Sequence, residues 1–131
     1  METVGVGLAE PLDFESDVPV YEQISNRIKF AIARRAFKPN EKLPSVRTLA
    51  RHLVVNPNTI VRVFRDLEQE GLIYAKRGIG MFVATRAGQR CDRERLAIVE
   101  EKLREALDVA RRAELSEPEI EELWNRLREE S

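Results

Sequence analysis

Cysteine and histidine are nearly absent from this sequence of 131 residues, which contains one of each, Cys91 and His52. A single cysteine cannot form an intrachain disulfide, and the two residues together cannot supply a Cys/His zinc site. His52 has no serine or cysteine partner at a fixed spacing, so a solvated or packed histidine is favoured over a catalytic base. We therefore expect no metal site, no cofactor, no catalytic residues and no enzyme activity.

Long apolar runs and an early positive charge are missing as well. A membrane-spanning helix needs about 20 consecutive apolar residues, and the best charge-free stretch here, residues 52–61, has about half that length. No Lys or Arg precedes Arg27, which leaves out the positive start of a secretory signal. With only six Gly and six Pro, the chain is neither low-complexity nor fibrous. We expect a cytoplasmic protein that folds in water without a membrane partner.

The charge is distributed unevenly although the formal net charge is only -1. Residues 1–18 carry five acids and no base, residues 19–91 carry fourteen Lys/Arg against five acids, and residues 92–131 carry eight against thirteen. A basic segment between acidic ones suits a protein that binds nucleic acid, because phosphate attraction needs positive charge only on the contact face. A basic surface that is merely solvated is the alternative.

Two helices are predicted at the start of the basic segment. Apolar residues recur at helical spacing from Pro19 to about Ala36, with Asp17 or Val18 as the start position. After a break at residues 37–40, Ser45 is a suitable N-cap for a short second helix. The expected buried positions are Val20, Ile24, Ile28, Ala31, Ile32, Leu49, Ala50 and Leu53.

A third helix and a hairpin follow. Asn56 is the predicted N-cap, Pro57 takes the first helical position, and Gly71 ends the helix. Two β-type runs at 72–75 and 81–84 are joined by the basic loop 76–80. The buried stripe of the third helix contains Ile60, Val63, Phe64 and Leu67. The order of three helices and a hairpin predicts a mainly α fold with an N-terminal winged helix-turn-helix.

The third helix has the two faces that a recognition helix requires. Asn58, Thr59 and Arg62 can donate or accept hydrogen bonds at base edges or phosphates, whereas the apolar stripe points to the core. A three-helix bundle with ordinary polar exposure is the alternative. We place the DNA-binding domain at residues 18–86, after an N-terminal arm of residues 1–17. In that arm Leu12 and Phe14 alternate with acids, which fits a short strand or nothing regular.

Two further helices are predicted in residues 87–131. Glu100 and Arg104 can pair across one turn of the first, and Ser116 with Glu119 forms a capping box for the second. The apolar stripes of the two helices contain Leu96, Val99, Leu103, Leu107, Leu123, Trp124 and Leu127. A homodimer is the simplest way to bury these stripes, so we interpret residues 87–131 as a dimerisation tail. Packing back on the chain's own core, or an effector cleft at Trp124, is the alternative.

Four segments, in order, resemble the winged-helix domain of GntR-type bacterial transcription regulators: LPSVRTLA at 43–50, NPNT at 56–59, LEQEGLI at 67–73 and RGIG at 77–80. PVYEQI at 19–24 matches too, and the resemblance covers about residues 12–85. The NPNT form, with a short tail after it, resembles the YtrA-like branch. That tail is shorter than the large ligand domains of other members, so we expect no dedicated metabolite pocket. The sequence does not identify a small-molecule effector.

The resemblance implies that Arg47, Thr59, Arg77 and Gly78 lie at DNA-contacting positions. Arg47 would contact a base or a phosphate, with an ion pair to an acid such as Glu41 as the alternative. Gly78 would let the wing backbone approach the minor groove, with simple turn chemistry as the alternative. For Arg77 the alternative is a solvated loop charge.

Pro57 and Asn58 stand where many relatives place Arg and Thr, and we expect Arg62, one turn later, to compensate. The full candidate set for DNA contact is Arg47, Asn58, Thr59, Arg62, Lys76, Arg77 and Gly78.

We therefore expect a sequence-specific transcription regulator, a repressor that binds an inverted repeat in double-stranded DNA as a homodimer. In YtrA-like relatives the regulated operon often encodes a transporter. The rival hypothesis is a protein-interaction module that uses the winged helix as a scaffold. Positive charge around Arg47, Arg62, Lys76 and Arg77 favours the first.

Overall fold

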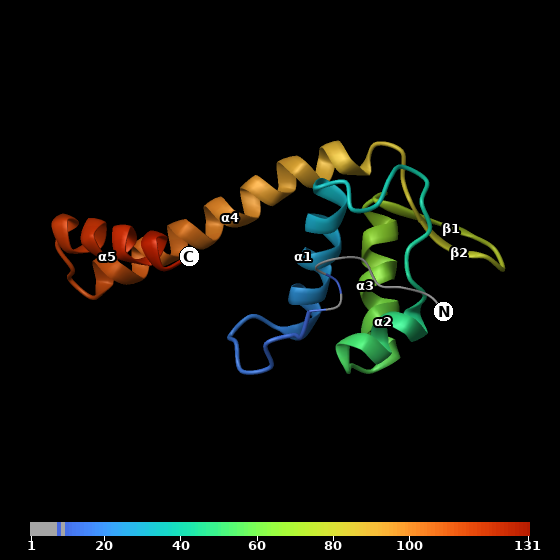
Figure 1. Ribbon diagram of the computed structural model, residues 1–131, viewed down its shortest axis with the longest axis horizontal. Coiled ribbons are helices and arrows are strands. Elements are labelled where there is room, and N and C mark those ends of the chain that lie inside the picture. The colour runs from blue at the N-terminus through green and yellow to red at the C-terminus, as the bar shows by residue number, and fades with distance from the viewer. Residues whose placement is uncertain (1–7, 9) are drawn as a thin grey trace. The chain divides into compact units, whose positions relative to one another are not determined.

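The computed structural model describes residue 8 and residues 10–131, and the chain divides into two compact units, residues 1–95 and 96–131. The described residues form five helices and one antiparallel hairpin, as the sequence predicts (Figure 1). The elements are α1 (Val20–Ala33), α2 (Val46–Leu53), α3 (Pro57–Gln69), β1 (Ile73–Lys76), β2 (Gly80–Val83), α4 (Ala87–Arg112) and α5 (Glu117–Glu130). None of the described helices has the length and apolarity needed to cross a bilayer.

Helix α1 is shorter than predicted at both ends. It begins after Pro19 without a side-chain cap, so neither Asp17 nor Val18 starts it. It ends at Ala33 because Arg35 takes a left-handed conformation with φ 62°. The Arg35 guanidinium donates a hydrogen bond of 2.7 Å to the Ala33 carbonyl. It also occupies the place where a Cβ on Gly88 of α4 would be.

Local side chains fix the ends of α2 and α3 as predicted. Ser45 Oγ accepts the Thr48 backbone N–H at 3.1 Å, and Asn56 Oδ1 accepts the Asn58 N–H at 2.8 Å. Between the two helices Val54 closes α2 in the left-handed region, with φ 57° and ψ 52°, and its side chain is 79% exposed. The turn of the helix-turn-helix therefore contains a β-branched residue in the left-handed conformation, which β-branched residues rarely adopt.

Each strand of the wing lies one residue closer to the turn than predicted. Its strands are 73–76 and 80–83 rather than 72–75 and 81–84, and Ile73 pairs with Val83 while Lys76 pairs with Gly80. The segment 40–43 adds a third, irregular row beside β2. There the Leu43 N–H donates to the Met81 carbonyl at 2.8 Å. The sequence did not predict this pairing, which anchors the wing to the segment before α2.

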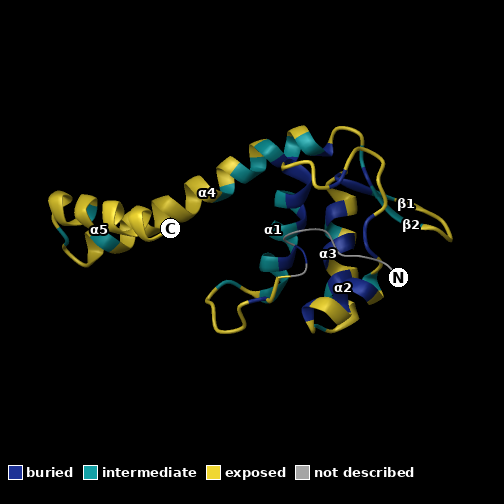
Figure 2. Cartoon of the chain, in the orientation of Figure 1, coloured by how far each residue is buried: buried dark blue, intermediate teal, exposed yellow. Residues whose placement is uncertain are grey.

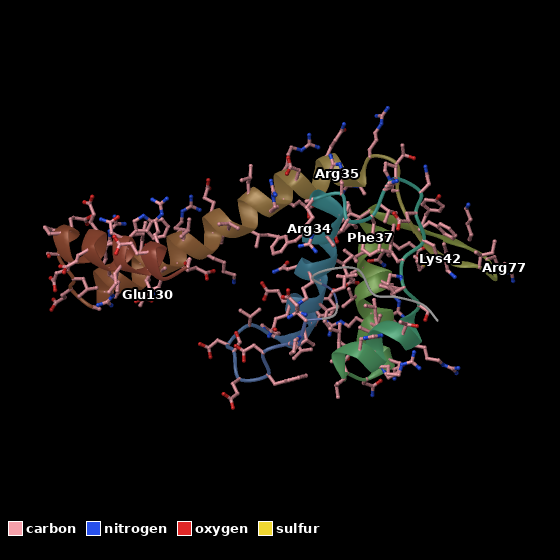
Figure 3. All side chains as sticks on the ribbon, in the orientation of Figure 1. Arg34, Arg35, Phe37, Lys42, Arg77 and Glu130 are labelled. Atoms are coloured by element: carbon pink, nitrogen blue, oxygen red, sulfur yellow. The ribbon has the colours of Figure 1, made fainter. Side chains whose placement is uncertain are left out.

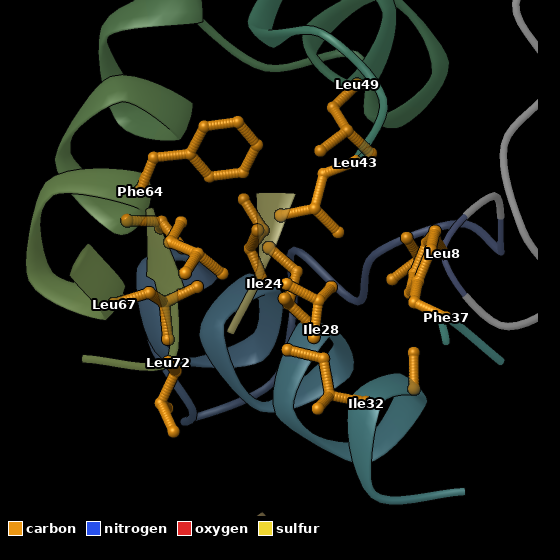
Figure 4. Packing of buried hydrophobic residues seen from close by; sticks show 14 of the residues in the cluster. Leu8, Ile24, Ile28, Ile32, Phe37, Leu43, Leu49, Phe64, Leu67 and Leu72 are labelled. Atoms are coloured by element: carbon orange, nitrogen blue, oxygen red, sulfur yellow. The ribbon is translucent and has the colours of Figure 1, made fainter. Parts of the chain in front are cut away.

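The core lies among α1, α2, α3 and the hairpin (Figures 2 and 4). Every apolar residue predicted to face it is buried, except Val20, which is half-buried. Leu8 and Leu12 from the N-terminal segment are buried too, and residues around Leu12 and Phe14 form no strand. The Gln23 side chain holds this segment by donating to the carbonyls of Asp13 and Val18, both at 2.8 Å.

An ion-pair triad joins three helices of the first unit. Lys29 of α1 lies 3.2 Å from Glu70, just after α3, and 3.1 Å from Glu94 of α4. Burial lowers the pKa of Lys29, but the hydrogen bonds to Glu94 and Glu70 outweigh it, so the pKa is raised above its ordinary value. Cys91 is fully buried nearby, and this burial raises the pKa of its thiol to about 11.

The second unit contains the rest of α4 and α5. Arg104 pairs with Glu100 at 3.1 Å, and Ser116 and Glu119 form the capping box, both as predicted. The apolar side chains of the predicted stripes remain more than a third exposed. Several of them line a groove of about 630 Å³ between the two helices: Leu103, Leu107, Leu123, Trp124 and Leu127, together with Ala106, Ala110 and Ile120.

Candidate nucleic-acid interface

The outer face of α3 presents polar and basic side chains away from the core. Asn58, Arg62 and Arg65 are exposed and follow one another at helical spacing, opposite the buried stripe. Thr59 lies on the flank of this line and is half-buried. Because Asn56 and Pro57 fix the first turn, the direction in which these side chains leave the helix is fixed as well.

Arg62 is held by a partner from another helix. Its guanidinium carbon lies 4.4 Å from the centroid of the Tyr21 ring, which belongs to the first turn of α1. The Tyr21 hydroxyl in turn donates a hydrogen bond to the Asp66 carboxylate, one turn after Arg62 on α3. The structure thus joins PVYEQI at 19–24 to the recognition helix.

Arg47 occupies the second position of α2 and is exposed. The alternative of an ion pair with Glu41 is not what the structure contains. Glu41 instead accepts the backbone N–H of Lys38 at 2.8 Å, and no salt bridge joins it to Arg47 within the described part of the chain. The Arg47 guanidinium is therefore available to an outside acceptor.

The basic residues of the wing lie beyond a pair of stacked aromatic rings. Tyr74 stacks on Phe82 with ring centroids 5.8 Å apart, and the Lys76 ammonium lies 4.5 Å from the Phe82 centroid. Arg77 and Gly78 follow at the exposed tip, where Figure 3 labels Arg77. Gly78 has φ 77°, so the turn itself favours glycine, and a Cβ there would meet nothing within 4 Å. The space beside it is open to a ligand.

Several basic residues outside the predicted contact set share these elements. Arg65 lies one turn after Arg62, Arg51 and His52 are exposed in the last turn of α2, and Lys42 borders β2 (Figure 3). The helical spacing of Arg65 from Asn58 could have identified it. Lys42 could not have been found this way, because its position depends on a pairing between segments far apart in the sequence.

The family model described as bacterial regulatory proteins, gntR family, matches residues 20–83. The HTH-type transcriptional repressor YtrA from Bacillus subtilis (strain 168) is 34% identical over 96 residues, which are 73% of this chain and 74% of that protein. The chain belongs to the GntR family. It is therefore a DNA-binding transcription regulator with a winged helix-turn-helix, in a family of regulators rather than enzymes.

Solved structures agree with this assignment. A GntR family transcriptional regulator from Listeria monocytogenes superposes with a TM-score of 0.67 at 27% identity, over 86% of this chain and 98% of that chain. The DNA-binding domain of AraR, in complex with operator ORX1, superposes with a TM-score of 0.53 at 31% identity, over 57% of this chain and 95% of that one. The second comparison is with a domain seen on its operator.

Proposed function

We propose that this GntR-family protein is a repressor that binds an inverted-repeat operator as a homodimer. The observation that carries the DNA-reading part is the outer face of α3, where Asn58, Arg62 and Arg65 stand exposed on a capped helix next to a basic wing. The repressor assignment is supported by the similarity to YtrA. The operator complex of the AraR domain supports duplex DNA as the ligand.

Specificity is assigned to Arg47, Thr59 and Arg62, with Asn58 as a weaker fourth residue. An arginine edge can bind guanine O6 and N7 with two parallel hydrogen bonds, which discriminates by about 1–3 kcal/mol against the wrong base. Threonine offers one hydroxyl or a methyl contact to thymine. The arginines should therefore dominate the sequence preference. Both Arg47 and Arg62 lack competing ion pairs within the described residues.

We assign to the wing contacts with the DNA backbone and the minor groove. Lys76 and Arg77 would bind phosphates or the minor-groove edge, and Gly78 would allow close approach of the chain. Residues 18–86 form the DNA-binding domain in this proposal, with residues 1–17 as an arm.

Dimerisation is assigned to the tail, residues 87–131. The exposed stripes and the groove between α4 and α5 form an exposed apolar surface of the kind that marks a protein–protein interface. A second copy would bury Leu96, Val99, Leu103, Leu107, Leu123, Trp124 and Leu127. A two-fold protein would read a two-fold operator.

The test of sequence reading is a binding selection from randomised duplexes. Arg47→Ala should relax the preference for a guanine in each half-site, and Arg62→Ala should lower affinity with a smaller change in preference. Arg93→Ala removes an exposed arginine from α4, outside α2, α3 and the wing, and is the control. If wild type and Arg47→Ala return the same sequence logo with equal information, Arg47 does not read bases.

The wing is tested by neutralising Lys76 and Arg77 to glutamine. Affinity should fall to a similar extent for all duplexes, and the slope of log affinity against log salt should flatten by about one unit per lost phosphate contact. Loss on one sequence only would contradict backbone contact. If the wild-type protein already has a shallow slope of log affinity against log salt, and the slope is the same in the neutralised variant, the scaffold hypothesis is favoured.

The dimer is tested by light scattering after chromatography. Leu107→Asp places a charge in the groove and should give monomers, whereas Val109→Asp changes an exposed residue of the same helix outside the groove and should not. A wild-type monomer at micromolar concentration that still binds an operator tightly would contradict a dimerisation role for the tail.

A further inference from the structure

The PVYEQI segment is a sequence motif of this chain that DNA contact by α2, α3 and the wing does not use. Its tyrosine, Tyr21, projects from the first turn of α1 to α3 and is half-buried against the core. It touches the two α3 residues Arg62 and Asp66, which lie four positions apart. One side chain of α1 therefore meets two successive turns of the recognition helix.

We infer that Tyr21 is a positioning residue for DNA reading, which holds the Arg62 guanidinium in the orientation that the major groove requires. This inference rests on the proposed role of Arg62 in DNA contact. The guanidinium carbon lies over the Tyr21 ring, and within the described residues no hydrogen bond or ion pair uses the Arg62 N–H groups. Base edges are read with those N–H groups, so the contact with Tyr21 orients Arg62 without consuming its donors.

The hydroxyl of Tyr21 has a second effect, because it occupies Asp66. An aspartate four residues after an arginine on a helix is placed to pair with it. Such a pair would turn Arg62 along the helix and satisfy its donors inside the protein. Instead the Asp66 carboxylate accepts the Tyr21 hydroxyl, and no salt bridge joins it to Arg62 in the described part of the chain. Tyr21 thus keeps the arginine and the carboxylate apart.

The test is a double-mutant cycle on affinity for the duplex recovered by the binding selection, at fixed salt. Tyr21→Leu keeps an apolar side chain against the core and removes the ring. We expect it to weaken binding about three- to tenfold in the wild-type background and by less than about twofold once Arg62→Ala is present. Arg65→Ala is the matched control, since this exposed arginine is on the same helix without a ring contact. When Arg65→Ala is present instead of Arg62→Ala, Tyr21→Leu should again weaken binding about three- to tenfold.

A second pair of variants separates the ring from the hydroxyl. Tyr21→Phe keeps the ring but frees Asp66, so it should also weaken binding, and Asp66→Asn should restore it. Glu68→Gln removes an equal charge from an exposed position of α3 and controls for the general gain from losing an acid near DNA. This pair decides the question if Tyr21→Leu does not fold, as judged from its unfolding curve.

Three results would overturn the inference. An equal loss with and without Arg62 would mean that Tyr21 contacts DNA itself or acts through the fold. A Tyr21→Leu protein that binds as wild type while Arg62→Ala is weakened would refute positioning and leave the proposed function intact. If Arg62→Ala itself binds like wild type, the proposed role of Arg62 fails as well.

Discussion

Val54 offers a direct test of the energetics of the helix-turn-helix. Its backbone is left-handed, and this conformation costs an ordinary L-residue about 1–2 kcal/mol, with branched side chains at the upper end. The side chain is 79% exposed, so replacing it removes little buried surface. Substitutions that tolerate the left-handed region should therefore stabilise the protein.

Each substitution at Val54 has its own expected magnitude. Asparagine tolerates the conformation and should raise the free energy of unfolding by about 1 kcal/mol. Glycine removes more strain but adds about 0.5–1 kcal/mol of backbone entropy to the unfolded chain, for a net gain of about 0.5–1 kcal/mol. Alanine keeps a Cβ and should change stability least.

Urea unfolding followed by far-UV circular dichroism measures the change in the free energy of unfolding. In thermal unfolding, a gain of 1 kcal/mol should raise Tm by about 4–8 °C for a unit of this size. Val61→Asn is the control, since Val61 is a partly exposed valine inside α3, where asparagine should lower stability. If Val54→Asn and Val54→Gly are both less stable than wild type, the strain assigned to this turn is absent.

Other predictions follow from the same contacts. Gly78→Val should lower stability as well as binding because φ is 77° there, whereas Gly78→Asn should retain the fold, as unfolding curves would show. The Cys91 thiol, with its pKa raised to about 11, should react with a disulfide reagent at neutral pH at least about 100-fold more slowly than an unperturbed thiol, and a fast native rate would contradict its burial. Lys29→Met should cost about 1–2 kcal/mol in urea unfolding by leaving Glu70 and Glu94 unpaired, and an unchanged midpoint would show that the triad is dispensable. The hydrogen bond from the Ser116 backbone N–H holds the pKa of Glu119 below its ordinary value of 4.5. This capping bond therefore stabilises α5 fully above pH 4.5, and the stabilisation is lost as the pH falls through the lowered pKa. NMR titration of Glu119 should find the low pKa, and Glu119→Gln should remove this acid dependence from the helicity.

Features governed by neighbouring residues could be predicted from the sequence. Ser45 and Asn56 cap the helices as expected because their side chains reach N–H groups two or three residues away. Gly71 takes φ 77° at the end of α3 as expected. The apolar stripes of α1 to α3 were predictable because each follows a helical period.

Features that depend on distant partners could not be predicted. Arg35 ends α1 in a conformation that arginine rarely takes, which no local rule indicates. Residues 40–43 pair with β2 although they lack a strand pattern. The contact of Tyr21 with Arg62 needs the relative placement of α1 and α3, which the periodicity of either helix does not give.

The contact between Arg35 and Gly88 has a consequence for how this sequence can vary. Glycine inside a helix is about 1 kcal/mol less favourable than alanine, and Gly88 lies within α4 at an ordinary backbone angle. A Cβ at this position would have to displace the guanidinium of Arg35, which fills that place and is hydrogen-bonded to the end of α1. The two positions should therefore change together during evolution. Relatives with a short residue at the position of Arg35 should be free to carry alanine at that of Gly88, whereas those with an arginine there should keep the glycine.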